Sequence, residues 1–239
     1  MRKTSKLFLM VLTSVQLATF GLRADSLYQL DNGAISTSIN ASEGTEPLDN
    51  WFGNVFTASA GSTLINRVDF GVFTTAPGSV ASVSIYSVTG TGGNPALGAT
   101  RLYTQTFTPL AGDGTNAFIQ QINLTSPVSL GVGSKFLVSV LIRNVIAAPP
   151  NDVYPYLLDT SGSAAGSYWD RSAPNTFNLD NLSGAVTVNQ PLTSGGFAPG
   201  ADHLIIRAFG TSVPEPSTFV LCGLAIPAAL ALRRRSQQR

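Results

Sequence analysis

Apolar and polar residues alternate over much of the middle of the chain, which is typical of strands with one buried face. Over residues 80–88 we expect Ala81, Val83 and Ile85 to face inward. The positions expected to face outward are Ser82, Ser84 and Tyr86. Residues 64–73 alternate in the same way. There the expected inward positions are Leu64, Val68, Phe70 and Val72, and the outward positions are Arg67 and Asp69.

A different pattern marks residues 135–145. Val138, Val140 and Ile142 form one apolar face, while Leu137 and Leu141 place apolar groups on the other. A strand that is apolar on both faces is usually covered on both sides. We therefore expect this segment to be the central strand of a sheet.

Turn-forming residues recur about every eight to twelve positions, and no stretch of about ten residues has a helical apolar period. The pattern is typical of a β-sandwich or barrel. We expect an all-β fold with a single β-sandwich, of jelly-roll or lectin-like type, over residues 25–212. The predicted strands are 26–30, 34–39, 51–58, 64–73, 80–88, 100–108, 117–124, 135–145, 153–158, 166–171 and 203–210.

The last part of the chain, residues 213–239, follows a different order. A Pro-Glu-Pro element is followed by an uncharged apolar run over 217–232 and then by an arginine cluster. As a helix, the run would extend roughly 24 Å, against a hydrocarbon core of about 30 Å. It is therefore a marginal transmembrane helix, with the arginines expected on the cytoplasmic side. On hydropathy alone, an ordinary C-terminal anchor is the alternative.

This order resembles the PEP-CTERM sorting signal of Gram-negative bacteria. The resemblance covers Val213 to about Arg235 and does not extend to the rest of the chain. It implies cleavage near the Pro-Glu-Pro element by an exosortase-type membrane enzyme, and an association with exopolysaccharide and biofilm. The residues that carry it are Val213, Pro214, Glu215, Pro216 and Ser217, with Arg233, Arg234 and Arg235 after the apolar run.

The first 24 residues predict a secretory signal peptide. Arg2, Lys3 and Lys6 precede an uncharged segment over 7–22, and small residues follow at Gly21 and Ala24. Cleavage after Ala24 is the first choice, cleavage after Gly21 is the second, and an uncleaved N-terminal anchor is a third interpretation. We expect export through the secretion translocon across the inner membrane, transient anchoring, and then a place at the cell surface or in the extracellular matrix.

The charge of the chain limits its classes of binding partner, and its cysteine content limits its disulfides. Residues 25–212 hold six basic and twelve acidic residues, a net charge of about −6. An acidic surface argues against nucleic acid or anionic lipid as a partner, because both need neutralising lysine and arginine. The single cysteine, Cys222, lies in the apolar tail, so the predicted ectodomain can form no disulfide.

The sequence contains few candidates for catalysis. Its single histidine, His203, follows Asp202, and a Ser-His-Asp triad would have to use it. Glu43, Glu46 and Asp49 could supply a glycosidase carboxylate pair, but a solvated acidic loop is the preferred interpretation. We expect a protein that is not an enzyme, and keep a secreted hydrolase as an alternative.

Two clusters suggest binding. Oxygen ligands beside the first and last strands, which often neighbour each other in a sandwich, could hold Ca²⁺; ordinary turn residues are the other interpretation. Aromatic side chains could stack on sugar rings, or could be core residues. The calcium candidates are Asp31, Asn32, Asp180 and Asp202, and the glycan candidates are Trp51, Tyr154, Tyr156, Tyr168 and Trp169.

The middle region is also similar, in its rhythm of strands and turns, to lectin-like β-sandwich domains of bacterial surface proteins. The similarity lies in residues 130–138, 154–156, 166–170 and 204–210. A structural or adhesive matrix protein is the leading interpretation. A carbohydrate-binding module that contacts extracellular polysaccharide is the second.

Overall fold

The computed structural model describes residues 26–35, 37–39, 47–73, 79–110, 117–145, 156–159, 165–190 and 203–211. The predicted signal peptide over 1–24, the predicted transmembrane helix over 217–232 and every residue of the predicted sorting motif lie outside these ranges. Within them, no helix is long and apolar enough to cross a membrane.

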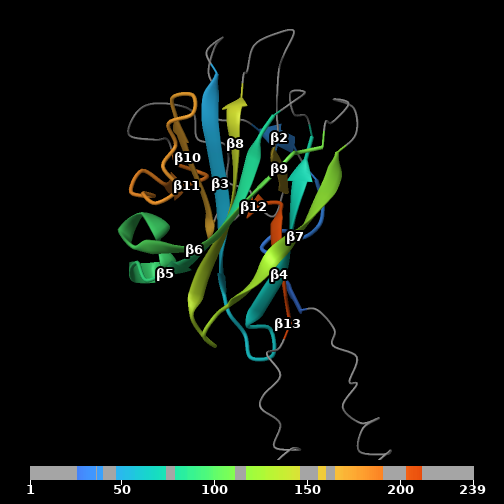
Figure 1. Cartoon of the computed structure of the whole chain (residues 1–239), viewed down its shortest axis with the longest axis vertical. Helices are drawn as coiled ribbons and strands as arrows, with labels where there is room; N and C mark the ends of the chain where they lie inside the picture. The colour runs from blue at the N-terminus through green and yellow to red at the C-terminus, as the bar shows by residue number, and fades with distance from the viewer. Residues whose placement is uncertain are drawn as a thin grey trace, which may run out of the picture.

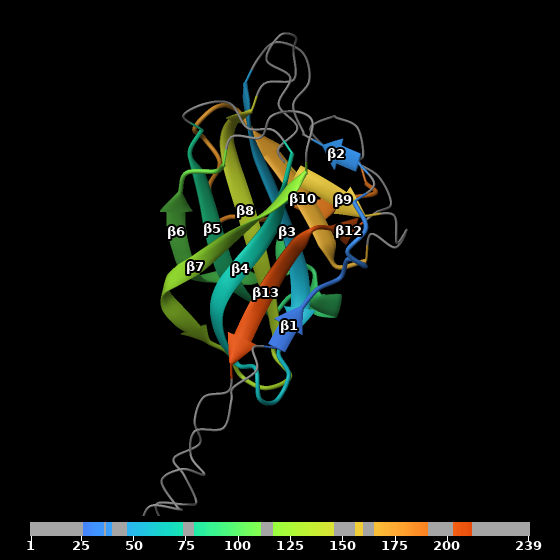
Figure 2. The same cartoon turned by 90° about the vertical axis from the view of Figure 1, so that its right-hand side faces the viewer.

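Two antiparallel sheets pack face to face (Figures 1 and 2). The larger sheet has the order β11 (Val186–Thr187), β10 (Ser167–Ser172), β3 (Leu48–Thr57), β8 (Lys135–Val145), β5 (Ala81–Val88) and β6 (Ala99–Phe107). The smaller sheet has the order β1 (Ser26–Tyr28), β13 (Ile206–Thr211), β4 (Leu64–Val72) and β7 (Phe118–Ser129). The predicted all-β sandwich is confirmed for the described residues.

A third, three-stranded sheet contains β12 (His203–Leu204), β9 (Tyr156–Asp159) and β2 (Thr37–Ile39). The sequence predicted one strand over 203–210, but the structure divides it into β12 and β13 at Ile205. The Ile205 amide donates to the Leu157 carbonyl at 3.0 Å, and the Ile205 carbonyl accepts from the Gly71 amide at 2.7 Å. The break lets one segment serve two sheets.

The main core lies between the two large sheets. Phe52, Val138 and Val140 of the larger sheet are buried there with Val68 and Phe70 of the smaller one. The predicted inward position of Leu64 is wrong, because a register shift between Ile65 and Arg67 places Ile65 in the core instead. Such a bulge reverses the alternation on one side of it.

A second core covers the outer face of the six-stranded sheet. The segment 173–185, called the strap here, passes over that face and places Phe177, Leu182 and Ala185 against Trp51 and Leu141. As expected, the central strand β8 is therefore buried on both sides, because Leu137 and Leu141 also have no exposed surface. The two short 3-10 helices, η1 (Thr91–Gly93) and η2 (Pro95–Leu97), lie in the connection between β5 and β6.

Candidate functional site

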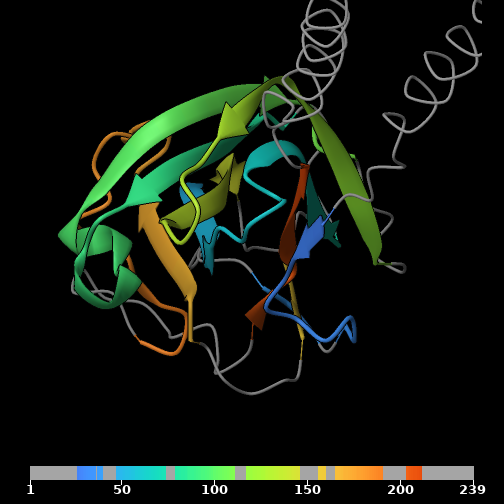
Figure 3. The ribbon, with the colours of Figure 1, turned by 90° about the horizontal axis from the view of Figure 1, so that it is seen from below.

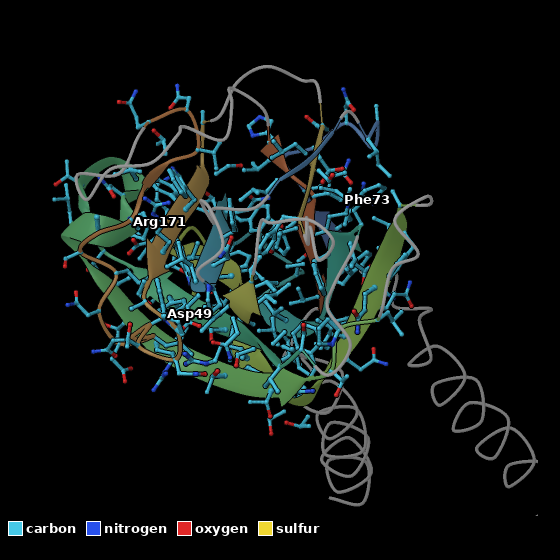
Figure 4. The ribbon with its side chains drawn as sticks, turned by 90° about the horizontal axis from the view of Figure 1, so that it is seen from above. Asp49, Phe73 and Arg171 are labelled. Carbon is cyan, nitrogen blue, oxygen red and sulfur yellow. The ribbon has the colours of Figure 1, made fainter. Side chains whose placement is uncertain are left out.

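Asp49 stands near the start of β3 and has no exposed surface. Its Oδ1 accepts from the amides of Asn144 and Asn175, at 3.2 and 3.1 Å. Its Oδ2 accepts from Arg143 Nη1 at 2.6 Å and from the Phe177 amide at 3.1 Å. Figure 4 labels Asp49 beside Arg171 of the neighbouring strand β10. One buried carboxylate thus joins β3, the end of β8 and the strap.

The backbone around Asp49 is arranged to bring these donors together. Asn144 and Asn175 both have φ of 58°, in the left-handed region that asparagine tolerates better than most residues. Their side chains also meet, because Asn144 Nδ2 donates to Asn175 Oδ1 at 3.3 Å. Two left-handed residues therefore turn their amides toward the same carboxylate oxygen.

Asp49 is thus an unsuitable member of a glycosidase carboxylate pair. Four donors already occupy its oxygens, and no face of it is open to a substrate. The prediction that Asp49 could belong to a glycosidase carboxylate pair is therefore wrong. The other two acidic candidates, Glu43 and Glu46, lie outside the described residues.

The predicted sugar-stacking aromatics form no exposed platform. Trp51, Tyr156 and Trp169 are at most 1% exposed and Tyr168 is 8% exposed. Trp51 stacks on Phe177 of the strap with ring centroids 6.0 Å apart. The prediction of a glycan-contacting face is therefore wrong for these four residues, because both faces of the larger sheet are covered. Tyr154 lies outside the described residues.

The polar ends of the buried aromatics are used within the fold. Tyr156 Oη donates to the Asn50 carbonyl at 2.7 Å and accepts from the Ile142 amide at 3.1 Å, beside the register shift between β3 and β8. Complete burial raises the pKa of Tyr156 well above its ordinary value. Trp169 Nε1 donates to the Gln190 carbonyl at 2.9 Å. The polar atoms of Tyr156 and Trp169 therefore form hydrogen bonds with the backbone of the domain and are not available to a ligand.

The calcium candidates do not converge. Asp31 is buried and pairs with Arg207, whose Nε is 3.0 Å from both carboxylate oxygens. Asp180 pairs with Arg101 of β6, in the other large sheet, at 3.0 Å. Asn32 Oδ1 accepts from the Ala34 amide at 2.8 Å, as in an ordinary turn.

The predicted calcium site is therefore wrong for Asp31 and Asp180, because each faces an arginine on a different sheet. Asp202 lies outside the described residues. Within the described ranges, no group of three or more histidine, cysteine, aspartate or glutamate side chains could hold a metal ion. The expectation that the first and last strands are neighbours is confirmed, because Ser26 of β1 pairs with Gly210 of β13.

The sequence did not point to Asp159, a buried carboxylate at the end of β9. Its Oδ2 accepts from the Asn32 amide, so it anchors the turn after β1. The hydrogen bond that Arg207 donates to Asp31 raises the pKa of Arg207. Burial acts in the opposite direction, and the charges of Asp31, Asp69 and Asp159 add to the increase. An alternating pattern could not reveal this cluster, because its members are distant in sequence.

His203 lies in a closed hydrogen-bond network. It is buried, and its Nδ1 is 3.4 Å from Ser167 Oγ. Ser167 Oγ donates to Asn54 Oδ1 at 2.7 Å and accepts from the Leu204 amide at 3.3 Å. Asn54 Nδ2 in turn donates to the carbonyls of Leu204 and Ile206, at 2.8 and 2.9 Å.

This network ties β3 and β10 to β12 and β13. The Ser167 proton is directed to Asn54, so the hydroxyl accepts from Nδ1–H of His203. A nucleophilic serine would instead give its proton to the histidine. The arrangement therefore serves as a buried polar link between the sheets.

Asp170 is a further carboxyl whose pKa is changed by burial. It lies on β10 beneath the strap, and a Cβ added to Gly184 would stand 2.8 Å from its Oδ2. Burial raises its pKa to about 6, with the hydrogen bond from the Arg171 amide acting in the opposite direction. Its cross-strand neighbour is Trp51, whose Nε1 is buried with no hydrogen-bond partner among the described residues.

Comparison with known proteins identifies solved structures with a similar fold. No family model matches the chain, and no curated protein matches it. Among solved structures, a clostridial cysteine protease, Cwp84 after propeptide cleavage, matches with a TM-score of 0.50 and 18% identity, over 79% of this chain and 40% of that one. The cysteine protease and lectin-like domains of Cwp84, a surface layer associated protein of Clostridium difficile, match with a TM-score of 0.45 and 17% identity, over 79% of this chain and 36% of that one.

Proposed function

We propose that this chain is an exported protein of the cell surface or extracellular matrix, with a structural or adhesive role associated with exopolysaccharide or biofilm. The single observation that carries the proposal is the tail: Val-Pro-Glu-Pro-Ser, a short uncharged run and an arginine cluster, in that order. Prolines keep the backbone beside Glu215 extended, where an exosortase-type processing enzyme could reach it.

The architecture of the described domain supports this assignment. Ser26 pairs with Gly210, so the segments that lead to the predicted signal peptide and to the predicted tail leave the sandwich side by side. A domain attached at one end in this way presents its other end away from the membrane. The matched protein Cwp84 is described as surface layer associated, and a surface location for this chain agrees with that description.

The roles of the buried polar residues support a non-enzymatic assignment. Asp49 is occupied by four donors and His203 belongs to a link between sheets. A carbohydrate-binding role would have to use residues other than the four buried aromatics. We therefore place recognition of polysaccharide second and make no assignment of its contact residues.

The test is replacement of the Pro-Glu-Pro element. The variant Pro214→Ala, Glu215→Ala, Pro216→Ala is expected to be exported and inserted normally, while its full-length form accumulates in the membrane fraction. Pro127→Ala, which replaces an exposed proline within β7, is the matched control and is expected to mature at the wild-type rate. If the triple variant also matures at the wild-type rate, the tail is a plain anchor and the proposal is wrong.

A further inference from the structure

One end of the sandwich carries both exits of the chain. Thr57 at the end of β3 pairs with Lys135 at the start of β8, and Leu64 at the start of β4 pairs with both Ser129 and Thr211. The turns 58–63 and 130–134 therefore lie at the end where β1 begins and β13 finishes. Seen from below, β1 and β13 run side by side (Figure 3). We call residues 58–63 and 130–135 the tail-side end.

The tail-side end differs in charge from the rest of the domain. It contains no acidic residue and one basic residue, Lys135, whereas residues 25–212 hold twelve acidic and six basic residues. Its most exposed large apolar side chain is Val132, at 68%. The tail-side end thus consists mainly of small, uncharged residues, with one cationic side chain, Lys135, and one exposed apolar side chain, Val132.

The two turns form a single fixed surface. The Gly133 amide donates to the Ala58 carbonyl at 2.7 Å, and the Ala58 amide donates to the Ser134 carbonyl at 2.9 Å. Tyr28 Oη donates to the Ser62 carbonyl at 2.9 Å, which ties the first strand to the same turn. The tail-side end therefore moves as part of the folded domain.

The backbone at both turn tips is open to the outside. Gly61 and Gly133 have φ of +86° and +77°, and a Cβ added at either would meet no atom within 4 Å. Glycine suits these positions because they need a left-handed backbone, and it also allows another surface to approach closely.

We propose that the tail-side end lies against the surface of the lipid bilayer while the tail is inserted. This inference rests on the proposed function. Only residues 212–216 separate Thr211 from the apolar run, so even a fully extended connection holds the domain within about 20 Å of the hydrocarbon boundary. The turns 58–63 and 130–134 carry no carboxylate, so these turns meet anionic headgroups without repulsion, while Val132 and Lys135 add apolar and electrostatic attraction.

The experiment uses the full chain in vesicles of phosphatidylethanolamine and phosphatidylglycerol, with no other protein present. In a Cys222→Ser background, Val132→Cys receives an environment-sensitive fluorophore, and a nitroxide-labelled lipid serves as the quencher. Ala173→Cys is the matched control, because Ala173 is exposed and follows Ser172, which pairs with Asp49 at the opposite end. We expect quenching at position 132 to exceed that at position 173 several-fold.

A second variant separates surface contact from the effect of the short connection. The label is moved to the exposed position Ala60→Cys, and Val132→Asp is added. The chain with the aspartate is expected to float with the vesicles as before, but to lose most of the quenching at position 60. Equal quenching with and without Val132→Asp would contradict the assigned role of this surface.

Flotation distinguishes failure of the inference from failure of the proposed function. If the labelled chain does not float with the vesicles, the tail is not inserted and the proposed function fails. If the chain floats but position 132 is quenched no more than position 173, the inference alone is overturned. Shielding of position 132 without quenching by the lipid would identify a second copy as the occupant, which also overturns it.

Discussion

At the residue scale, buried carboxylates hold together segments that are far apart in sequence. Asp49 accepts from the Phe177 amide, 128 residues away, and Asp31 pairs with Arg207, 176 residues away. A buried carboxylate is stable when charged donors and amides compensate for its lost hydration. Neither pair could be predicted from local periodicity, because alternation reports which face a residue occupies and not which partner it meets.

Asp49→Asn should destabilise the fold strongly. An amide cannot accept from all four donors, and Arg143 would be left without its carboxylate partner. We expect a loss of about 3 kcal/mol in the free energy of unfolding, measured by denaturant titration. Asp180→Asn removes an exposed ion pair and is the control, with an expected loss below about 1 kcal/mol. Equal losses in the two variants would show that Asp49 has no special structural role.

Asp170 should make stability depend on pH. Its pKa in the folded protein, about 6, lies above its ordinary value of 3.8, so the folded state holds this proton more tightly than the unfolded state. Its stabilising contribution is therefore complete below about pH 4 and is lost as pH rises through about 6. We expect a difference of about 1 to 2 kcal/mol, after allowance for solvent screening.

The comparison that isolates this effect is Asp170→Asn, whose side chain does not titrate. Between about pH 4 and pH 6 the free energy of unfolding of the wild type should fall relative to that of Asp170→Asn. Asp180→Asn removes an exposed carboxyl of the strap, and this variant should follow the wild-type curve. Parallel curves for wild type and Asp170→Asn would contradict the burial of this carboxyl beneath the strap.

At the element scale, the sequence predicts strands well and the features that interrupt them poorly. The alternation over 80–88 correctly places Ala81, Val83 and Ile85 in the main core, and the doubly apolar β8 is central. Ser82, Ser84 and Tyr86, which were predicted to face outward, are also buried. The bulge in β4 and the break at Ile205 were not predicted, because both depend on contacts with other strands. No strand was predicted for the strap, since its few apolar residues have no strand period.

The same limit explains the aromatic residues. Tyr168 and Trp51 face away from the main core, and a sheet with one open face would have exposed them. The strap covers that face instead, with Phe177 stacked on Trp51. The prediction of a glycan-contacting face was wrong because the strap, which covers these aromatic side chains, could not be recognised from the sequence.

Removal of Phe177 should open the second core. In a Trp169→Phe background, where Trp51 is the only tryptophan, Phe177→Ala is expected to shift the emission of Trp51 to longer wavelength. It should also lower the free energy of unfolding by about 3 kcal/mol, because Phe177 is buried. Leu97→Ala, at a side chain that is 68% exposed, is the control. Unchanged emission in Phe177→Ala would contradict the contact between the strap and Trp51.

At the scale of the whole molecule, the sandwich and the tail account for different parts of the proposed role. The paired first and last strands set both chain exits at one end, and only a few residues after Thr211 precede the proposed sorting motif. The fold alone assigns no ligand, because the same architecture serves many functions. The proposed location follows from the two ends of the sequence.

The intact mass of the mature protein, isolated from the cell surface, is the most direct test of the proposed export and tail processing. We expect a chain that begins at or near Asp25 and has lost the apolar run and arginine cluster by cleavage near Pro214, Glu215 and Pro216. Both processing events are read from one spectrum, because each removes a segment of different mass. A surface protein whose mass still includes residues 217–239 would contradict the central claim.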